Sequence, residues 1–570
     1  MSARPWTAFY HRNTATDLPP IPQPHLPALI SDAARRYGPK TAFTLGLPNG
    51  SKGGMSFADT EAHADAFAVY LREVAGLRPG DRLAIQMPNC LAYPVVVFGA
   101  LKAGVVMVNT NPLYTPSEMA HQFADSGAVA LVTIDLFADK VAEALPHTDI
   151  RTVIVVSIGD LLPTATRLIV WAVQKYVKKM IPPVRVPHVT FRRALAEGRA
   201  RQAAGADVAV YVASLTHDTV AALQYTGGTT GVSKGAMLTH GNLLANIEQC
   251  LQAWRPWLTE GEEVVLTALP LYHIFAFTAN LMLFFVTGGR DILVPSPRPL
   301  TNLKTVLEAE PVTWFTGVNT LFAGLMHEPW FLARPSWTLK GSIAGGMALV
   351  PAVGERWEQV TKTPIYQGYG LTETSPVVTL NPFHRQKRAS IGVPLPGTDV
   401  RIVDDEGRDV ATGEAGELLV RGPQVMPGYW QRPDETARVL RDGWLYTGDI
   451  ARMDEDGYVF IVDRKKDMIL VSGFNVYPNE VEAVIAAHPG VQDCAVVGVP
   501  DEDTGEWVVA YVIRKDRGLT AEDIRTHCRQ SLTSYKVPKL VVFRDELPKS
   551  PVGKVLRKDL RDDAAREKRG

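Results

Sequence analysis

Short apolar segments alternate with helix-like segments from about residue 26 to residue 316. This alternation is typical of βαβ units, in which parallel strands form a sheet and helices cover its faces. The expected strands lie at 82–86, 105–109, 128–133, 152–157, 263–266, 291–294 and 312–316. The sequence therefore predicts an α/β architecture, built around largely parallel sheets, for the N-terminal part of the chain.

The pattern changes near residue 390 to short strands separated by Gly, Pro and Asp turns. These strands are expected at 400–403, 416–421 and 458–462 and indicate a small antiparallel β subdomain over about 390–463. The charged break at 463–467 then precedes a compact α+β segment that continues to residue 570. Because one hydrophobic core rarely covers a chain of 570 residues, we expect two domains, at 1–463 and 464–570, joined by a hinge at 463–467.

Composition excludes some classes of protein. The chain has 59 basic and 60 acidic residues, so its charge gives no support to general nucleic-acid binding. The four cysteines, Cys90, Cys250, Cys494 and Cys528, are far apart, which favours a reduced cytoplasmic location over a disulfide framework or a zinc site. Residues 1–24 contain prolines and polar residues where a signal peptide needs an apolar core.

Two segments are apolar enough to be considered for membrane contact. Segment 274–287 has about 14 mostly apolar residues, fewer than the ~20 that span a bilayer, so a buried core helix or strand is expected. Segment 167–180 has an imperfect split between an apolar side and a basic side at helical spacing. It fits either a helix lying in a membrane interface or an ordinary surface helix that packs its apolar face on the domain.

A loop rich in glycine and hydroxyl side chains follows the apolar segment 220–223. Its residues are Tyr225, Thr226, Gly227, Gly228, Thr229, Thr230, Gly231, Val232, Ser233, Lys234 and Gly235. Backbone N–H groups without a neighbouring Cβ, hydroxyls and one lysine suit phosphate oxygens. The loop lacks both the Gly-Lys-Ser/Thr ending of ATPases and the Gly-x-Gly-x-x-Gly of dinucleotide sites. A flexible linker is the alternative, but the preceding strand-like segment favours a ligand loop.

The order of this loop resembles the AMP-binding signature of adenylate-forming enzymes: acyl-CoA synthetases, aryl-CoA ligases, luciferases and peptide-synthetase adenylation domains. Further motifs of that family follow in the family's order, at 345–347, 369–374, 443–449, 463–467, 472–478 and 550–555. The resemblance covers about residues 25–560. It implies two α/β subdomains and a small β-barrel-like subdomain in the N-terminal domain, followed by a small mobile C-terminal domain.

The resemblance also implies how ATP is held. The loop and Lys234 contact the β- and γ-phosphates, and Glu373 with Thr229 holds Mg²⁺, which a carboxylate facing phosphates requires. The nucleoside is expected against Tyr369, Gly345, Gly346, Gly370, Thr372, Asp449 and Arg464, with Asp449 accepting from the ribose hydroxyls. For Glu373 a helix-capping role is the alternative.

In the family, a lysine at the position of Lys554 bridges the substrate carboxylate and the α-phosphate, which is electrostatic catalysis aimed at developing charge. On residue type alone, Lys554 would be a solvated surface charge. The resemblance further implies that the C-terminal domain rotates about Lys466, removes Lys554 and presents Ser472 and Gly473 to the pantetheine arm of CoA.

The expected acyl pocket lies beside the nucleotide site and is predicted from four segments. Segment 271–277 resembles bacterial long-chain fatty-acid–CoA ligases, as do 175–180, 225–240 and 368–378. The resemblance places His273 near the reacting carboxylate, although a core histidine fits equally well. The expected pocket residues are Phe277, Val318, Gly346 and Met347. The alternative interpretation is that these residues simply pack in the core. An apolar channel suits an alkyl chain, since each buried methylene contributes about 0.8 kcal/mol.

The expected function is an ATP- and Mg²⁺-dependent long-chain fatty acid–CoA ligase that forms acyl-AMP and pyrophosphate, then acyl-CoA and AMP. Alternatives are a medium-chain or aryl acid–CoA ligase, a ligase that loads a carrier protein, or a lipid-binding or uptake protein with a degenerate nucleotide site. The expected partners are fatty acid, ATP and CoA, with peripheral membrane contact through 167–180 and a homodimer as further expectations.

Overall fold

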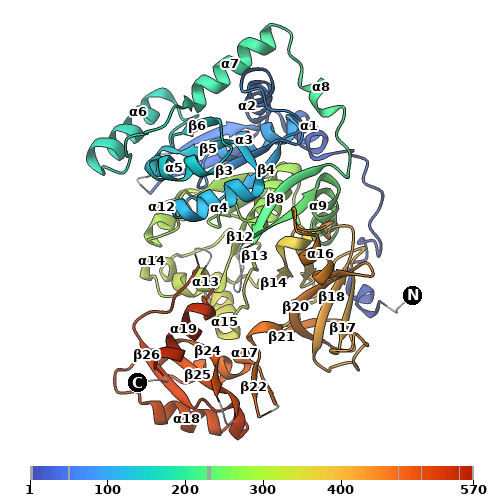
Figure 1. Cartoon of the computed structure of the whole chain (residues 1–570), viewed down its shortest axis with the longest axis vertical. Helices are drawn as coiled ribbons and strands as arrows, with labels where there is room; N and C mark the ends of the chain where they lie inside the picture. The colour runs from blue at the N-terminus through green and yellow to red at the C-terminus, as the bar shows by residue number, and fades with distance from the viewer. Residues whose placement is uncertain are drawn as a thin grey trace.

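The computed structural model describes residues 4–48, 50, 52–226, 233–472, 474–501, 504–550 and 553–567, with backbone alone for 565–567. Two large sheets with helices around them form the upper and middle parts of the molecule (Figure 1). A smaller sheet lies beside them, and a fourth sheet forms the lower part with the C-terminal end of the chain (Figure 1).

The first large sheet has the strand order β7-β6-β5-β3-β4-β8-β9. Its strands are β3 (Arg82–Gln86), β4 (Val106–Asn109), β5 (Ala128–Ile134), β6 (Thr152–Val156), β7 (Val189–Thr190), β8 (Val220–Thr226) and β9 (Lys234–Thr239). Neighbouring strands are parallel except β8 and β9, which form an antiparallel hairpin. The central strands are buried on both faces, which explains their continuous apolar sequences.

The second large sheet has the order β16-β15-β14-β13-β12-β10-β11-β1-β2. Its strands are β1 (Thr41–Gly46), β2 (Lys52–Ser56), β10 (Val264–Thr267), β11 (Arg290–Leu293), β12 (Trp314–Gly317), β13 (Gly341–Ala344), β14 (Ile365–Gly370), β15 (Val377–Leu380) and β16 (Val393–Pro394). The strands from β14 to β1 in this order are parallel, and antiparallel strands close both edges.

Helices surround the two large sheets (Figure 1). The α-helices are α1 (Leu26–Tyr37), α2 (Phe57–Val69), α3 (Ala92–Lys102), α4 (Pro116–Ser126), α5 (Ala138–Ala144), α6 (Thr164–Ala172), α7 (Phe191–Ala203), α8 (Val208–Val212), α9 (His240–Trp254), α10 (Ile274–Ala276), α11 (Leu283–Val286), α12 (Thr301–Ala309), α13 (Asn319–Leu325), α14 (Pro329–Leu332) and α15 (Pro351–Thr361). Short helical turns are η1 (Pro5–Phe9), η2 (Tyr70–Val74), η3 (Asp135–Phe137), η4 (Leu145–His147), η5 (Val173–Val177), η6 (Arg255–Trp257), η7 (Phe277–Met282) and η8 (Thr372–Thr374).

The third sheet is fully antiparallel, as the turn-rich sequence predicts. It contains β17 (Asp399–Val403), β18 (Gly416–Arg421), β19 (Leu440–Arg441), β20 (Trp444–Met453) and β21 (Val459–Arg464), and α16 (Pro433–Val439) precedes β19. The C-terminal part contains η9 (Lys465–Asp467), β22 (Ile469–Val471), β23 (Phe474–Val476), α17 (Pro478–Ala486), β24 (Val491–Asp501), β25 (Gly505–Arg514), α18 (Ala521–Arg529), η10 (Ser534–Lys536), β26 (Leu540–Arg544) and α19 (Arg557–Glu567).

The predicted fold class is confirmed, and the predicted strands agree closely with the observed ones. The break at 463–467 is the end of β21 followed by the single turn η9, and the domain boundary placed there stays a prediction. Segment 274–287 is buried, as expected, and forms α10, η7 and α11. Within the described residues, the helices are too short or too polar to cross a membrane.

Segment 167–180 departs from one of its two interpretations. It is helical, as α6 and η5, but Ile169, Tyr176, Val177 and Met180 on the predicted apolar side are exposed. The prediction that this side packs on the domain is therefore wrong for these four residues. Val170 alone is buried among the residues of α6.

Candidate functional site

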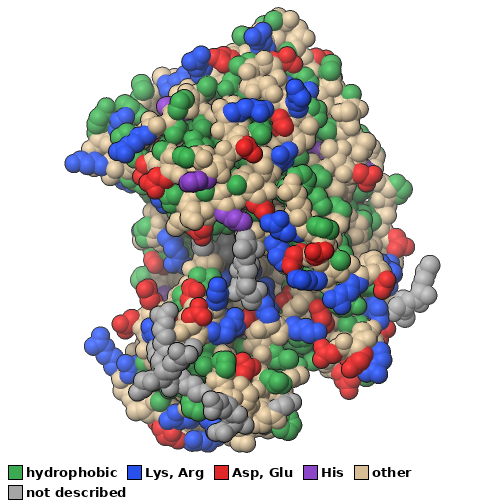
Figure 2. Space-filling view, viewed as in Figure 1, with side chains coloured by type: hydrophobic (Ala, Val, Ile, Leu, Met, Phe, Trp, Pro, Cys, Tyr) green, Lys and Arg blue, Asp and Glu red, His purple; other side chains and the backbone are tan. Residues whose placement is uncertain are grey.

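The predicted site residues gather where the parallel strands of the second large sheet end. Open α/β sheets bind ligands outside the carboxyl ends of their strands, and four neighbouring strands contribute here. His273 follows β10, Val318 follows β12, Gly345 and Gly346 follow β13, and Thr372 and Glu373 follow β14. The molecular surface is hollowed between this region and the C-terminal part, and Lys and Arg side chains lie beside the hollow (Figure 2).

Tyr369, Asp449 and Arg464 form one polar group at the predicted nucleoside site. The hydroxyl of Tyr369 donates to Oδ2 of Asp449 at 2.5 Å, and Nε of Arg464 lies 3.3 Å from Oδ1. Strand pairing places Asp449 opposite Arg464, so the backbone of β20 and β21 fixes this arrangement. Burial, followed by the charge of Asp449, raises the pKa of Tyr369 well above its ordinary value. The tyrosine therefore stays neutral and orients the carboxylate.

Glycine is needed at Gly345, Gly346 and Gly370 for different structural reasons. A Cβ on Gly370 would lie 1.9 Å from the carbonyl oxygen of Pro376, so the close approach there is between β14 and the start of β15. Gly346 has φ +77°, a backbone conformation that residues with a side chain rarely adopt, and a Cβ added there would lie 3.9 Å from the Val318 side chain. A Cβ on Gly345 would meet the ring of Phe275 at 3.1 Å.

The predicted phosphate loop connects the two strands of the β8–β9 hairpin. Gly227, Gly228, Thr229, Thr230, Gly231 and Val232 lie outside the described residues. At the base of the loop, the Ser233 hydroxyl donates to the carbonyl of Thr226 at 2.6 Å. Tyr225 is buried and donates to Asp125 at 2.7 Å, which anchors the strand. These two hydrogen bonds fix the positions of the residues on either side of the predicted phosphate loop.

Lys234, at the start of β9, already has an anionic partner. Its Nζ contacts the carboxylate of Glu435, in the first turn of α16, and lies 5.4 Å from the centre of the Tyr429 ring. Gly235 accepts a backbone hydrogen bond from Trp430 at 2.8 Å. The segment before α16 therefore runs along the predicted phosphate lysine.

Glu373 lies in η8 and is held from two directions. The Tyr429 hydroxyl donates to its Oε1 at 2.7 Å, and its carbonyl accepts from the backbone N–H of Met426 at 2.8 Å. Within the described part of the chain, no cluster of three or more acidic, His or Cys side chains could hold a metal by itself. A single carboxylate nevertheless fits Mg²⁺, which is usually held by one or two carboxylates together with substrate phosphates and water. Thr229, its predicted companion, is outside the described residues.

Lys554 reaches the site from the C-terminal part of the chain. Burial and the like charge of Arg464 lower the pKa of Lys554 to about 8, although Asp449 and Glu373 act in the opposite direction. Burial and the charge of Lys554 in turn lower the pKa of His273 to about 4. Lys554 therefore lies within electrostatic range of these predicted site residues.

His273 also has a local role. Its Nδ1 accepts from the backbone N–H of Phe275 at 3.3 Å and so caps α10. Among the predicted acyl-pocket residues, Phe277 and Val318 are buried and Met347 is partly buried against the core. These positions are compatible with a pocket wall and with packing alike, so their role stays a prediction.

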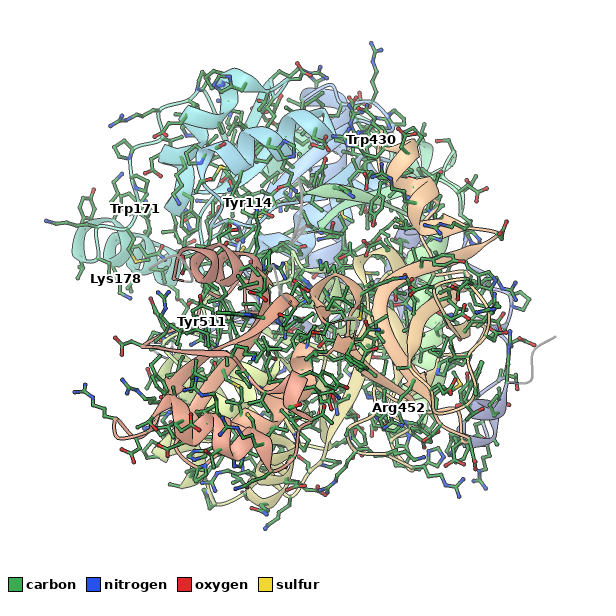
Figure 3. All side chains as sticks on the ribbon, turned by 60° about the horizontal axis from the view of Figure 1, so that its bottom comes forward. Tyr114, Trp171, Lys178, Trp430, Arg452 and Tyr511 are labelled. Atoms are coloured by element: carbon green, nitrogen blue, oxygen red, sulfur yellow. The ribbon has the colours of Figure 1, made fainter. Side chains whose placement is uncertain are left out.

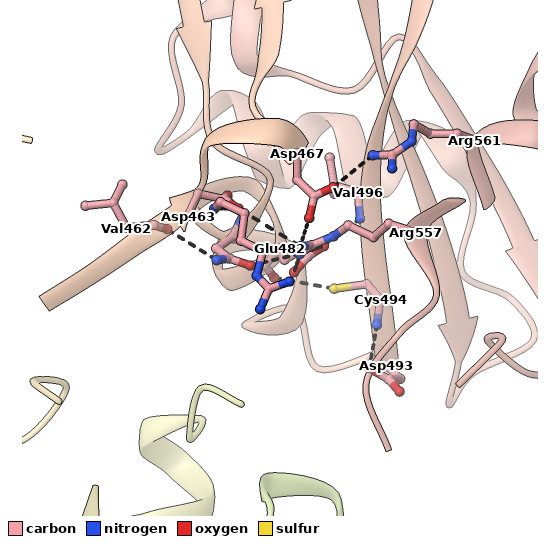
Figure 4. A network of polar contacts seen from close by, with 11 residues as sticks. Val462, Asp463, Asp467, Glu482, Asp493, Cys494, Val496, Arg557 and Arg561 are labelled. Atoms are coloured by element: carbon pink, nitrogen blue, oxygen red, sulfur yellow. Dashed lines mark hydrogen bonds and ion pairs between the residues drawn. The ribbon is translucent and has the colours of Figure 1, made fainter. Parts of the chain in front are cut away.

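A network of charges fixes the loop that carries Lys554. Arg557 donates to Glu482 at 2.8 Å and to Asn479 at 2.9 Å, and it lies 3.4 Å from Asp467 (Figure 4). Glu482, Asp463 and Asp467 raise the pKa of Arg557 above its ordinary value even though burial lowers it. The partly buried guanidinium of Arg557 therefore connects the predicted hinge to the segment that follows Lys554.

Lys466 lies in the predicted hinge, and Ser472 and Gly473 form the predicted CoA loop. Burial, then the charge of Arg464, lowers the pKa of Lys466. Ser472 is exposed, with φ +50°, and its backbone N–H donates to Thr504 at 2.6 Å. Gly473 lies outside the described residues.

Sequence reasoning missed Tyr429 and Glu435. Tyr429 is 56 residues from Glu373, and Glu435 is 201 residues from Lys234. The local sequence, an aromatic pair after glycine and an acidic first turn of a helix, is ordinary. No local signal reveals what these side chains meet.

The comparisons with known proteins agree with this geometry. Residues 30–430 match the family model of the AMP-binding enzyme, and residues 480–554 match that of the AMP-binding enzyme C-terminal domain. The chain therefore belongs to the AMP-binding enzyme family and has the fold of adenylate-forming enzymes.

Within that family the chain is similar to named acyl-CoA ligases. It is 50% identical to a long-chain-fatty-acid–CoA ligase of Yersinia pestis and 48% identical to one of Escherichia coli O157:H7, over 98% of both chains in each case. A feruloyl-CoA synthase of Amycolatopsis is 36% identical over 89% of this chain and 93% of its own length.

Solved structures share the fold. ATP-bound MatB from Rhodopseudomonas palustris has a TM-score of 0.78 and 29% identity, covering 94% of this chain and 98% of its own. The anthranilate CoA ligase AuaEII with anthranoyl-AMP has a TM-score of 0.83, covering 96% and 99%, but at 24% identity it supports the fold alone.

Proposed function

We propose that this chain is an ATP-dependent long-chain fatty acid–CoA ligase. The observation that carries the proposal is the position of Lys554: its loop lies against α13, where a Cβ on Gly553 would be 2.7 Å from the Thr320 hydroxyl, and its ammonium is close enough to Glu373 and Asp449 for their charges to raise its pKa. Relatives that are half identical over nearly the whole chain and are named long-chain-fatty-acid–CoA ligases support the acyl specificity.

In the first half-reaction, the fatty acid carboxylate attacks the α-phosphorus of ATP, and the bond to pyrophosphate breaks. Asp449, oriented by Tyr369, accepts from the ribose hydroxyls. Lys234 holds phosphate oxygens, and Lys554 stabilises the charge that develops between the carboxylate and the α-phosphate. Glu373 would hold Mg²⁺, which neutralises phosphate charge when it is bound.

In the second half-reaction, the thiol of CoA attacks the carbonyl carbon of acyl-AMP, and AMP leaves. In the proposed mechanism, Lys554 moves away before this step so that the thiol of CoA can approach the reacting carbon. We assign the movement to the 463–467 hinge and the CoA contact to Ser472 and Gly473. Exposure of Ser472 beside the exposed Phe474 supports this assignment, since both are then available to meet a second surface.

The test is ATP–pyrophosphate exchange with carboxylic acids from acetate to oleate, and with coumarate, followed by CoA-thioester formation. We expect the highest kcat/KM with long-chain acids. The highest value with coumarate or a medium-chain acid would favour those ligase classes. Exchange that no acid stimulates would overturn the ligase assignment and favour a lipid-binding protein with a degenerate site.

We also propose that α6 and η5 contact an anionic membrane surface. Ile169, Tyr176 and Val177 are 60%, 64% and 74% exposed, and Trp171 and Lys178 lie at the outer edge of the molecule (Figure 3). Residues 161–196 contain no Asp or Glu, but they include Arg167, Lys175, Lys178, Lys179, Arg185, Arg192 and Arg193. Exposed apolar side chains among basic ones fit the boundary between acyl chains and anionic headgroups.

Vesicle sedimentation tests this contact. Vesicles of phosphatidylcholine with phosphatidylglycerol should sediment the protein, whereas phosphatidylcholine alone should sediment less. A Tyr176→Ser/Val177→Ser variant should lose most of the binding, and the matched control Val210→Ser, at an exposed valine of α8, should keep it. Equal sedimentation of all three proteins would contradict the proposal. A cytoplasmic location and a homodimer stay predictions.

A further inference from the structure

The segment that precedes α16 lies against the strand that carries Lys234. Trp430 donates its backbone N–H to Gly235 at 2.8 Å, and Met237 donates to Gly428 at 3.0 Å. An isolated antiparallel bridge also pairs Ala236 with Tyr429. Backbone hydrogen bonds thus fix the start of α16 beside Lys234.

Glu435 uses this position to bind the lysine. One carboxylate oxygen contacts Nζ of Lys234, and the other accepts from Arg438 at 2.6 Å. The hydrogen bond to Lys234 is the main cause of the lowered pKa of Glu435. Both side chains remain about one-third exposed, so an entering ligand can reach the pair.

We propose that Glu435 is an internal anion that occupies Lys234 when ATP is absent and gives up its place to the triphosphate, so that Glu435 sets the affinity for ATP and pyrophosphate. This inference rests on the proposed function, in which Lys234 binds phosphate oxygens. Glu435 is a positioning residue, because it acts on the substrate through Lys234.

The exchange leaves neither partner without a counter-charge. The ammonium of Lys234 passes from a carboxylate to phosphate oxygens, and Glu435 keeps its contact with Arg438. A partly exposed ion pair is weak because water and salt screen it, so a highly charged triphosphate displaces the carboxylate.

The same competition acts on the product. After the α-phosphorus bond breaks, pyrophosphate is held partly by Lys234, and the carboxylate of Glu435 competes for that lysine. Glu435 therefore weakens pyrophosphate binding and favours its release. The cost of this arrangement is a higher KM for ATP.

The test compares Glu435→Gln with the matched control Asp434→Asn, which removes an exposed carboxylate one residue earlier in α16. In ATP–pyrophosphate exchange, Glu435→Gln should lower KM for ATP by about two- to five-fold, the range for a partly exposed ion pair. In the forward reaction, the inhibition constant of added pyrophosphate for acyl-CoA formation should fall by a similar factor. Asp434→Asn should change neither value.

A double-mutant cycle with Lys234→Gln separates this role from a structural one. In the Lys234→Gln background, Glu435→Gln should no longer change KM, because the residue through which it acts is absent. A persistent effect there, or an unchanged or higher KM in the single variant, would overturn the inference. Calorimetric titration with ATP alone tests the role of Glu435 independently of the ligase assignment, because Glu435→Gln should lower the Kd for ATP. The ligase assignment itself fails only if no acid stimulates exchange.

Discussion

Replacing Lys554 by alanine is the most direct perturbation of the proposed mechanism. The charges of Asp449, Glu373 and Arg464 act on Lys554, although it belongs to the part of the chain beyond the predicted hinge. Its removal should therefore slow the formation of acyl-AMP and leave the transfer of the acyl group to CoA largely intact.

The magnitude follows from the environment of the ammonium group. The fall in the pKa of Lys554 from 10.5 to about 8 means that a charged lysine costs roughly 3 kcal/mol in the substrate-free site. The carboxylate and α-phosphate supply negative charge that removes this cost as the transition state forms. Loss of one such electrostatic donor typically reduces kcat by about 10²–10³, or roughly 3–4 kcal/mol.

Two assays separate the half-reactions. Fatty-acid-dependent ATP–pyrophosphate exchange should fall by about 10²–10³-fold in Lys554→Ala, whereas acyl transfer from synthetic oleoyl-AMP to CoA should stay close to that of the parent enzyme. Lys549→Ala is the matched control, because Lys549 lies in the same region but pairs with Asp493 at 2.6 Å. Equal loss of both half-reactions in Lys554→Ala would refute the reasoning.

Two further predictions concern the same site. Because the active form of Lys554 is the cation and its pKa is about 8, kcat/KM for exchange should be maintained below that pH and should fall as pH rises through it; a profile that rises between pH 8 and 9 would contradict the assigned protonation state. His273, with a pKa of about 4, should add no second limb between pH 6 and 8. Tyr429→Phe removes the 2.7 Å hydrogen bond to Glu373, so the Mg²⁺ concentration for half-maximal exchange should rise by about ten-fold, with a smaller change in kcat; an unchanged Mg²⁺ titration would show that Tyr429 does not orient this carboxylate.

The fold was largely predictable because its strands are short, apolar and regularly spaced. The prediction at 82–86 coincides with β3, and that at 416–421 coincides with β18. Periodicity reports which residues share a side of an element, and burial of parallel strands makes their apolar segments continuous. The meeting of Glu373, Asp449 and Lys554 was predictable only through the resemblance, because no local pattern links residues so far apart.

The remaining features depend on contacts between distant elements. The pair of Lys234 and Glu435 needs α16 to dock beside β9, and the sequence of neither element specifies that docking. For segment 167–180, the sequence also leaves the contacts with other elements undetermined. Its spacing reveals an apolar side, but spacing cannot tell whether another part of the chain covers that side.

The charges around Arg557 have a consequence for the order of events in catalysis. Asp463 and Asp467 stand at the two ends of the hinge, and Nη1 of Arg557 lies 4.0 Å and 3.4 Å from them. Asp463 also accepts the backbone N–H of Asn479 at 2.7 Å, which ties β21 to the start of α17. Since Arg557 is three residues from Lys554, the proposed rotation about the hinge should withdraw the lysine in the same movement. The enzyme would then have no state in which the hinge has turned while the lysine still blocks the thiol.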